Sequence, residues 1–154
     1  MDITKLRKFM RRAETVALDS HDSETKVGSV LISKSTMSVV SEGFNGFVRG
    51  APDDKLPTTR PDKYQFMQHA EANLITSAFR NGVGGGQYFI VQTLSPCANC
   101  VRMCWQAGIT EIYFKDIYRD FDNSKNLGDL QILFTTVGEY YKIELRSVKG
   151  VTNE

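Results

Sequence analysis

Two closely spaced pairs of side chains constrain this sequence more than any other feature. His69 and Glu71 are separated by one alanine, and Cys97 and Cys100 follow a proline with two residues between them. Residues two apart in a regular helix point in nearly opposite directions, so His69 and Glu71 face one site only where a helix begins. Two cysteines three apart share one face of a first helical turn, where the helix dipole favours thiolates. We therefore expect each pair to lie at the beginning of a helix.

These residue types together predict a zinc site of the catalytic kind. One imidazole and two thiolates, from His69, Cys97 and Cys100, leave a tetrahedral Zn²⁺ with an open fourth position for water, whereas structural zinc sites are closed. Glu71 is not needed as a ligand, and we expect it to act as base and acid by moving the protons of that water. The sequence thus predicts one catalytic zinc per chain.

A lone Cys-x-x-Cys also occurs in structural zinc knuckles and in redox pairs, which are the two alternative interpretations. The sequence contains no second Cys-x-x-Cys, and His21 is the only other histidine, so a fourth ligand for a closed site is missing. Cys104, one turn beyond Cys100, is expected to pack in the core. Three cysteines so close together do not form a disulfide framework.

Length and charge limit the remaining possibilities. The chain has 154 residues, which suits a single domain over residues 1–154. Its 19 basic and 18 acidic residues give a formal charge of +1 without a long basic block, so we do not expect binding to nucleic acid. No run approaches the length of a membrane span, and the charged N-terminus lacks the apolar core of a signal peptide. We therefore expect a cytoplasmic protein without membrane contact.

The pattern of apolar residues predicts an α/β fold. Helical and strand-like segments alternate along the chain, which favours a three-layer α/β/α sandwich with a mixed five-stranded sheet and helices on both faces. The right-handed crossover rule predicts parallel strands in the middle of this sheet. The long loop 43–63 is expected to be a working surface. The predicted helices cover residues 3–17, 69–80, 96–107 and 127–137, the predicted strands cover residues 27–33, 37–41, 88–94, 111–114 and 141–148, and a further loop covers residues 115–126.

With these motifs the chain resembles the cytidine deaminase superfamily, and within it the deoxycytidylate (dCMP) deaminases. The His-x-Glu and Pro-Cys-x-x-Cys motifs are shared by nucleoside, nucleotide, tRNA and polynucleotide deaminases. The segment Gly43–Gly50 is more specific, because it is similar to the G-Y-N-G-x-P-R-G loop of the dCMP branch. Lys26–Ile32 and Ala107–Ile109 are similar to further segments of that branch. The resemblance implies a hydrolase that converts dCMP to dUMP and ammonia and so supplies dUMP for thymidylate synthesis.

The resemblance also implies contacts with the nucleotide. Asn45 is expected to contact the sugar, since its amide donates and accepts; the alternative is an asparagine placed for turn geometry. For Arg49, Lys26 and Arg119 the alternative is a solvated surface charge. For Tyr118 the alternative is an aromatic residue of a loop without a role in binding. The expected contacts are the phosphate with Arg49 and Lys26, the pyrimidine edge with backbone groups of Ala70 and Ser95, and a cover over the nucleotide from Tyr118 and Arg119.

Regulation and assembly are implied by the same resemblance. Members of the family are often dimers or hexamers, and many are activated by dCTP and inhibited by dTTP, with Mg²⁺ on the triphosphate. We expect a homo-oligomer with an effector site in the glycine-rich loop. The residues of that site are Gly43, Asn45, Gly46, Arg49 and Gly50. Two positions depart from the family loop, Val48 in place of proline and Phe44 in place of tyrosine.

Two other functions fit the metal motif. A tRNA or polynucleotide base deaminase shares it, but binding a strand requires a basic stripe and exposed aromatic side chains, and a charge of +1 offers little of the former. A non-catalytic zinc-binding module does not require a carboxylate next to an open coordination position, so Glu71 argues against it. Both stay open as alternatives to a dCMP deaminase.

Overall fold

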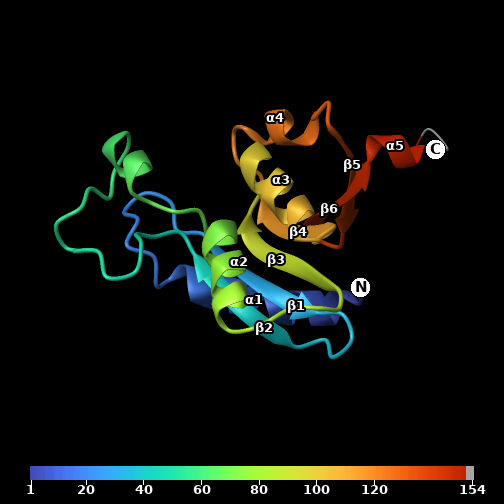
Figure 1. Ribbon diagram of the computed structural model, residues 1–154, viewed down its shortest axis with the longest axis horizontal. Coiled ribbons are helices and arrows are strands. Elements are labelled where there is room, and N and C mark those ends of the chain that lie inside the picture. Colours follow the sequence, from blue (N-terminus) through green and yellow to red (C-terminus); the bar gives the residue numbers. More distant parts are fainter. Residues whose placement is uncertain (152–154) are drawn as a thin grey trace.

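The sheet of this protein has six strands, all within residues 1–151, which the computed structural model describes (Figure 1). They are β1 (Gly28–Ser33), β2 (Val39–Phe44), β3 (Tyr88–Leu94), β4 (Glu111–Asp116), β5 (Leu130–Val137) and β6 (Tyr140–Ser147). Their order across the sheet is β2-β1-β3-β4-β6-β5. In the middle, β3 and β4 run parallel, as the crossover rule predicts, and all other neighbouring pairs are antiparallel.

Helices cover both faces of the sheet, which confirms the predicted three-layer sandwich (Figure 1). The helices of the protein are α1 (Ile3–Ala17), the 3₁₀ helix η1 (Asp62–Gln65), α2 (Ala70–Arg80), α3 (Ala98–Gln106), α4 (Phe121–Lys125) and α5 (Val148–Val151), of which η1 and α5 lie outside the two layers. The helix α1 packs on one face, while α2, α3 and α4 contribute buried side chains to the core on the other. None of the described helices is long and apolar enough to cross a membrane.

The two cores follow from the alternation of side chains along the central strands. Val30 and Ile32 of β1 are buried against α1, whereas Leu31 between them is buried on the side of α2. Leu6 of α1 and Leu74 of α2 are fully buried in the two cores. Burial of each such side chain contributes about 1.5–3 kcal/mol to folding, which fixes both helices on the sheet.

At Gly43 the strand β2 and the helix α2 approach each other so closely that no side chain fits between them. A Cβ at this position would overlap the backbone carbonyl oxygen of Ala70 and lie 2.5 Å from the backbone nitrogen of Leu74. The side chain of Asn73 also donates to the carbonyl oxygen of Phe44 at 2.8 Å. The end of β2 and the first turns of α2 therefore hold one another in place.

Gly43→Ala is expected to lower the stability of the protein by about 2 kcal/mol, because overpacking of a close contact destabilises by about 1–3 kcal/mol. Thermal unfolding followed by circular dichroism measures this effect as a lower melting temperature. Gly84→Ala is the matched control, since a Cβ at Gly84 meets nothing within 4 Å. Equal melting temperatures for the two variants would contradict the close contact.

The helix predicted for residues 127–137 is wrong: the segment forms β5, so the sheet has six strands rather than five. Apolar residues recur there at helical spacing, which is the pattern that the prediction followed. The pairing of β5 with β6 continues to Val137 and Tyr140, which leaves only Gly138 and Glu139 for the turn. Gly138 has a φ of +59°, the left-handed conformation that tight hairpin turns require. The hairpin, rather than the helical spacing, decides the structure.

Residues 45–69 connect β2 to α2 and extend away from the sheet, on the left of Figure 1. They contain η1 and most of the loop predicted for residues 43–63. The short helix α4 lies within residues 115–126, which were predicted as a loop. Side chains from residues 45–69 and from the segment between β4 and α4 line the same cavity.

Candidate active site

His69 and Cys97 occupy equivalent positions, each immediately before the first turn of a helix. His69 caps α2 with an extended backbone (φ −71°, ψ 154°), and Cys97 caps α3 in the same way (φ −77°, ψ 167°). Glu71 and Cys100 then lie in the first turns of these helices and are buried. The prediction that each pair lies where a helix begins is confirmed.

The three potential metal ligands meet between these two helix ends. The Nδ1 atom of His69 lies 3.3 Å from Sγ of Cys100 and 3.6 Å from Sγ of Cys97, and the three ligand atoms all lie within 4.8 Å of one another. A tetrahedral Zn²⁺ with bonds of about 2.0 Å to nitrogen and about 2.3 Å to sulfur separates those atoms by about 3.6 Å. The donor types and their spacing therefore fit zinc. Within residues 1–151 no other group of three or more metal-ligating side chains is found.

A hydrogen bond between Cys97 and Cys100 shifts the pKa values of the two thiols in opposite directions. The side chain of Cys100 lowers the pKa of Cys97 to about 4, against the effect of burial and with a contribution from His69. The same hydrogen bond, together with burial, raises the pKa of Cys100. The hydrogen bond to Cys97 in turn raises the pKa of His69. The lowered pKa of Cys97 favours its thiolate form, which suits a cationic ligand.

Glu71 lies beside the three potential metal ligands, and its side chain is almost completely buried. The residue is 4% exposed, and burial raises the pKa of its carboxyl group, although His69 and a hydrogen bond with Gln92 act in the opposite direction. A carboxyl group with a raised pKa can take up a proton and give it back during one reaction. The position of Glu71 therefore suits proton transfer.

A cavity of about 470 Å³ opens onto His69, Glu71 and Cys97. Its volume lies within the range of about 300–1,000 Å³ that is typical of small-molecule pockets. Its walls come from the loop after α1, the segment between β2 and α2, the end of β3 and the loop after β4. The other lining residues are Asp22, Thr25, Val27, Asn45, Arg60, Lys63, Tyr64, Met67, Gln68, Ala70, Leu94, Ser95, Tyr118, Arg119 and Asp120.

Most of the residues predicted to contact a nucleotide line this cavity. Lys26 and Arg49 do not: the ammonium group of Lys26 donates to the carbonyl oxygen of Ser20 at 2.8 Å, and Arg49 is exposed. The glycines of the predicted effector site also lie outside the lining. The predicted contact residues that line the cavity are Asn45, Ala70, Ser95, Tyr118 and Arg119, and the glycines outside it are Gly43, Gly46 and Gly50.

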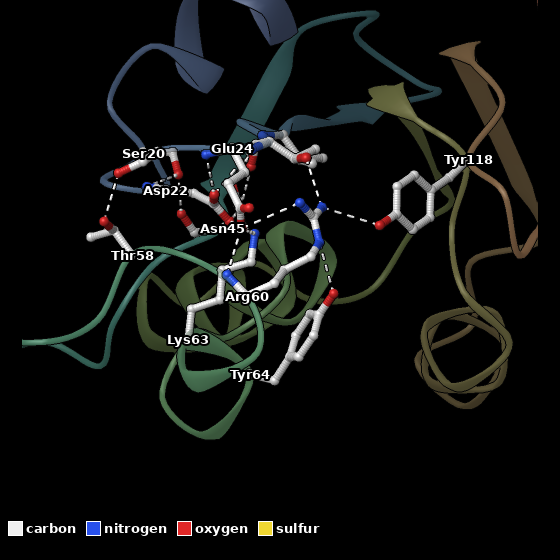
Figure 2. Close-up of polar contacts among 12 residues, drawn as sticks. Ser20, Asp22, Glu24, Asn45, Thr58, Arg60, Lys63, Tyr64 and Tyr118 are labelled. Carbon is white, nitrogen blue, oxygen red and sulfur yellow. Dashed lines mark hydrogen bonds and ion pairs between the residues drawn. The ribbon is translucent and has the colours of Figure 1, made fainter.

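Seven polar residues of the cavity wall are not among the predicted site residues: Asp22, Thr25, Arg60, Lys63, Tyr64, Gln68 and Asp120. Arg60 donates to the hydroxyl oxygen of Tyr64 at 2.8 Å and to that of Tyr118 at 3.1 Å, so it joins two sides of the cavity (Figure 2). Charged and aromatic residues occur in most surface loops, so their type alone does not mark a site. The one available signal was the long loop that contains Arg60 and Lys63.

The sequence is similar to known proteins over most of its length. The family model of the cytidine and deoxycytidylate deaminase zinc-binding region matches residues 3–116. A deoxycytidylate deaminase from Homo sapiens is 32% identical over 141 residues, which is 87% of this chain and 76% of that protein. A probable deoxycytidylate deaminase from Caenorhabditis elegans is 32% identical over 117 residues, which is 73% of this chain but only 58% of that protein.

A solved structure has a similar fold. The crystal structure of dCMP deaminase from the cyanophage S-TIM5, in complex with dCMP and dUMP, matches with a TM-score of 0.67 and 26% identity. The match covers 79% of this chain and 88% of that chain. The similarity therefore extends well beyond the two short motifs that hold the metal-ligating side chains.

Proposed function

The chain belongs to the cytidine and deoxycytidylate deaminase family of hydrolytic deaminases, and we propose that it uses zinc to convert dCMP and water to dUMP and ammonia. One observation carries this proposal: a single cavity is lined by two of the three potential metal ligands, His69 and Cys97, by Glu71, and by Arg60 and Arg119. The reaction requires a metal site, a proton carrier and side chains that bind an anion.

His69, Cys97 and Cys100 would hold one zinc ion per chain, which when bound supplies a Lewis acid that activates water for attack. The carboxylate of Glu71 takes a proton from the attacking water and delivers it to the ring nitrogen of cytosine. Glu71 then transfers a second proton to the amino group, which leaves as ammonia while the carbonyl group of uracil forms. Burial separates this carboxyl group from bulk water, so that its protons are exchanged with the substrate.

Two backbone groups are suited to the edge of the pyrimidine. The N–H of Ala70 belongs to the first turn of α2, whose N–H groups have no acceptor within the helix. The N–H of Ser95 donates to the carbonyl oxygen of Asp116 at 2.9 Å, so Ser95 offers its own carbonyl oxygen to the amino group of cytosine. The hydroxyl oxygen of Ser95 accepts from the N–H of Tyr118 at 2.8 Å. That bond links the base-binding edge to the loop that carries Arg119.

Arg60 and Arg119 are the cavity residues best suited to the 5′-phosphate, because a guanidinium group binds phosphate through paired, charge-assisted hydrogen bonds. Arg119 lies over the ring of Tyr118, 4.8 Å from its centroid. Arg60 is held by the hydroxyl groups of Tyr64 and Tyr118. The guanidinium group of Arg60 also lies 3.3 Å from a carboxylate oxygen of Glu24, so its charge is partly balanced. No ion pair of Arg119 is found within residues 1–151, so the charge of Arg119 is the more available to an anion.

Arg119→Ala is expected to raise the KM for dCMP about 10- to 100-fold, because a hydrogen bond to a charged group contributes about 1.5–3 kcal/mol. Deoxycytidine lacks the phosphate, so its KM should be the same for the wild type and the variant. Steady-state kinetics of ammonia release from both compounds measure the difference. Arg80→Ala, at the exposed end of α2, is the matched control. An equal rise in KM for deoxycytidine would contradict the phosphate contact.

We propose further that the glycine-rich loop responds to nucleoside triphosphates, with dCTP and its Mg²⁺ as activator and dTTP as inhibitor. Residues 48–50 are exposed, and Lys26 is a second exposed cation, whereas Asn45 in the same loop lines the cavity. A few residues of chain therefore connect an exposed surface to the nucleotide pocket. Sedimentation would test whether the protein is the proposed homo-oligomer, a dimer or hexamer. Comparison of samples with and without dCTP would test whether this effector changes the assembly. The effector residues of the proposal are Gly43, Asn45, Gly46, Arg49 and Gly50.

The extent of the domain and its cellular role are also part of the proposal. A single deaminase domain over residues 1–154 is supported by one continuous sheet and by a family match that begins at residue 3. Residues 152–154 of this predicted domain lie outside the described residues. The supply of dUMP for thymidylate synthesis and the cytoplasmic location stay predictions.

Ammonia release from the zinc-loaded protein tests the proposed substrate. We expect efficient turnover of dCMP and much slower turnover of deoxycytidine, dCTP and a single-stranded oligonucleotide. Turnover of the oligonucleotide alone would instead favour a tRNA or polynucleotide base deaminase. Zinc binding without turnover of any of these compounds would favour a non-catalytic zinc-binding module.

A further inference from the structure

The wall of the cavity contains a buried ion pair that the proposed reaction does not use. The ammonium nitrogen of Lys63 in η1 lies 2.7 Å from Oδ2 of Asp22, in the loop between α1 and β1 (Figure 2). Asp22 is 2% exposed and Lys63 is 3% exposed. A buried ion pair contributes little net stability, because the loss of hydration around two charges offsets their attraction. A role in the cavity explains the pair better than a role in stability.

Asp22 is held firmly and in its charged form. Its Oδ1 atom accepts hydrogen bonds from the backbone N–H groups of Glu24, at 2.8 Å, and Thr25, at 3.0 Å. Burial acts to raise the pKa of this carboxyl group, but the hydrogen bonds from Lys63, Thr25 and Glu24 outweigh burial and the pKa is lowered. Asp22 therefore presents two acceptor oxygens at fixed positions.

The Oδ2 atom of Asp22 is shared between Lys63 and Asn45 (Figure 2). The Nδ2 group of Asn45 donates to this oxygen at 3.1 Å and to the carbonyl oxygen of Thr25 at 2.9 Å. The Oδ1 atom of Asn45 accepts from the N–H of Val27 at 2.8 Å. A flipped amide would place its NH₂ against an N–H and its oxygen against two acceptors, so only one orientation is compatible with these neighbours.

This arrangement determines what Asn45 can offer to a ligand. Both N–H groups of its amide are already donated, whereas an amide oxygen has two lone pairs and Oδ1 uses one of them. Asn45 lines the cavity, so the group that it offers there is an acceptor. Its partner on the ligand must be a donor, and the sugar of a deoxynucleotide 5′-phosphate carries its one free hydroxyl group at C3′.

We propose that Asp22 and Lys63 are positioning residues for substrate specificity, because they fix the amide of Asn45 as an acceptor for the 3′-hydroxyl group of the nucleotide. This inference rests on the proposed deamination of dCMP and goes beyond it. Asp22 and Lys63 act through Asn45 rather than on the substrate. The ion pair also connects the loop after α1 to η1, so two walls of the cavity share one support.

Asp22→Asn tests the proposal because it keeps the size of the side chain. The Oδ1 atom stays bound to two backbone N–H groups, so the new NH₂ takes the place of Oδ2 and faces the donors of Lys63 and Asn45. We expect kcat/KM for dCMP to fall about tenfold, through KM, as for the loss of one hydrogen bond to the ligand. For 2′,3′-dideoxycytidine 5′-phosphate, which lacks the 3′-hydroxyl group, we expect a change of less than about twofold by the same reasoning.

Two further variants separate positioning from general damage to the fold. Asp129→Asn, in an exposed ion pair with Arg102, is the matched control and should leave both substrates unaffected. Lys63→Gln keeps a donor to Asp22 without the charge, so it should cause a smaller loss that is again confined to dCMP. An equal loss with both substrates, or no loss with dCMP, would overturn the proposal.

The side-chain amide of Asn45 provides a readout that does not depend on activity. In the zinc-loaded wild type both Nδ2 protons are donated, so their NMR signals should exchange slowly with water. In Asp22→Asn we expect fast exchange of at least one of them. Fast exchange in the wild type, or unchanged slow exchange in the variant, would overturn the positioning role. If the wild type deaminates no cytosine nucleotide, the proposed function fails, whereas this measurement still decides whether Asp22 positions Asn45.

Discussion

The Glu71→Gln protein is expected to bind zinc as the wild type does and to lose at least about 100-fold in kcat for dCMP, which is the usual contribution of a general acid–base group. Glutamine has the shape of glutamate but cannot carry a proton. Glu71 is almost completely buried, so a water molecule cannot readily replace its carboxyl group. Ammonia-release kinetics and metal analysis of the same sample measure both quantities.

Glu139→Gln is the control for this variant, since Glu139 is an exposed carboxylate that pairs with Arg7 away from the cavity. It should retain the kcat of the wild type. If Glu71→Gln also retained it, the proton transfer would have been assigned to the wrong residue. A parallel loss of zinc would show instead that Glu71 supports the metal site.

The second large effect is expected from Cys100→Ala, which should abolish tight zinc binding and, with it, turnover. His69, Cys97 and Cys100 form the metal group, in which the Sγ atom of Cys100 lies 3.3 Å from Nδ1 of His69. Removal of this sulfur atom leaves two protein ligands. Even the outer partners of metal ligands contribute about 10- to 100-fold to affinity, so the loss of a ligand should lower zinc affinity by more than about 100-fold. Competition with a chelating dye measures the affinity.

Cys104→Ala is the matched control for the loss of a sulfur atom from α3. Cys104 is fully buried in the core and is not part of the metal group. Its variant should keep zinc and turnover and lose about 1 kcal/mol of stability through poorer packing. If Cys104→Ala lost zinc while Cys100→Ala kept it, the ligand set would be wrong.

The metal group could be predicted because its geometry is local. His69 and Glu71 lie within one helical turn, as do Cys97 and Cys100, and the beginning of a helix determines which of their side chains converge. The only long-range requirement is that α2 and α3 lie together, and both cover the same face of the sheet. An alternating pattern of helices and strands is enough to predict that layer.

Residues 127–137 are the opposite case, because two patterns overlap in one short segment. Apolar residues at helical spacing predicted a helix, although a short apolar segment fits a strand equally well. The turn at Gly138 and Glu139 and the pairing with β6 decide the outcome. Gly138 followed by a polar residue was the available sign of a hairpin.

The polar cluster around Asp22 could not be predicted, because its contacts join residues that are far apart in the sequence. Asp22 and Lys63 are separated by 41 positions, and Arg60 and Tyr118 by 58. A single charged residue in a loop is most often solvated. The resemblance to the dCMP deaminases implies a phosphate contact for Lys26, but its ammonium group binds the backbone carbonyl oxygen of Ser20.

The central claim is that one zinc ion, held by His69, Cys97 and Cys100, makes this chain a dCMP deaminase. The most direct test removes the metal with a chelator, adds zinc back in steps, and measures bound zinc and the dUMP formed from dCMP in each sample. Turnover should rise in proportion to bound zinc and reach its plateau at one ion per chain. Full turnover without zinc, or one bound zinc per chain with no dUMP formed, would contradict the claim.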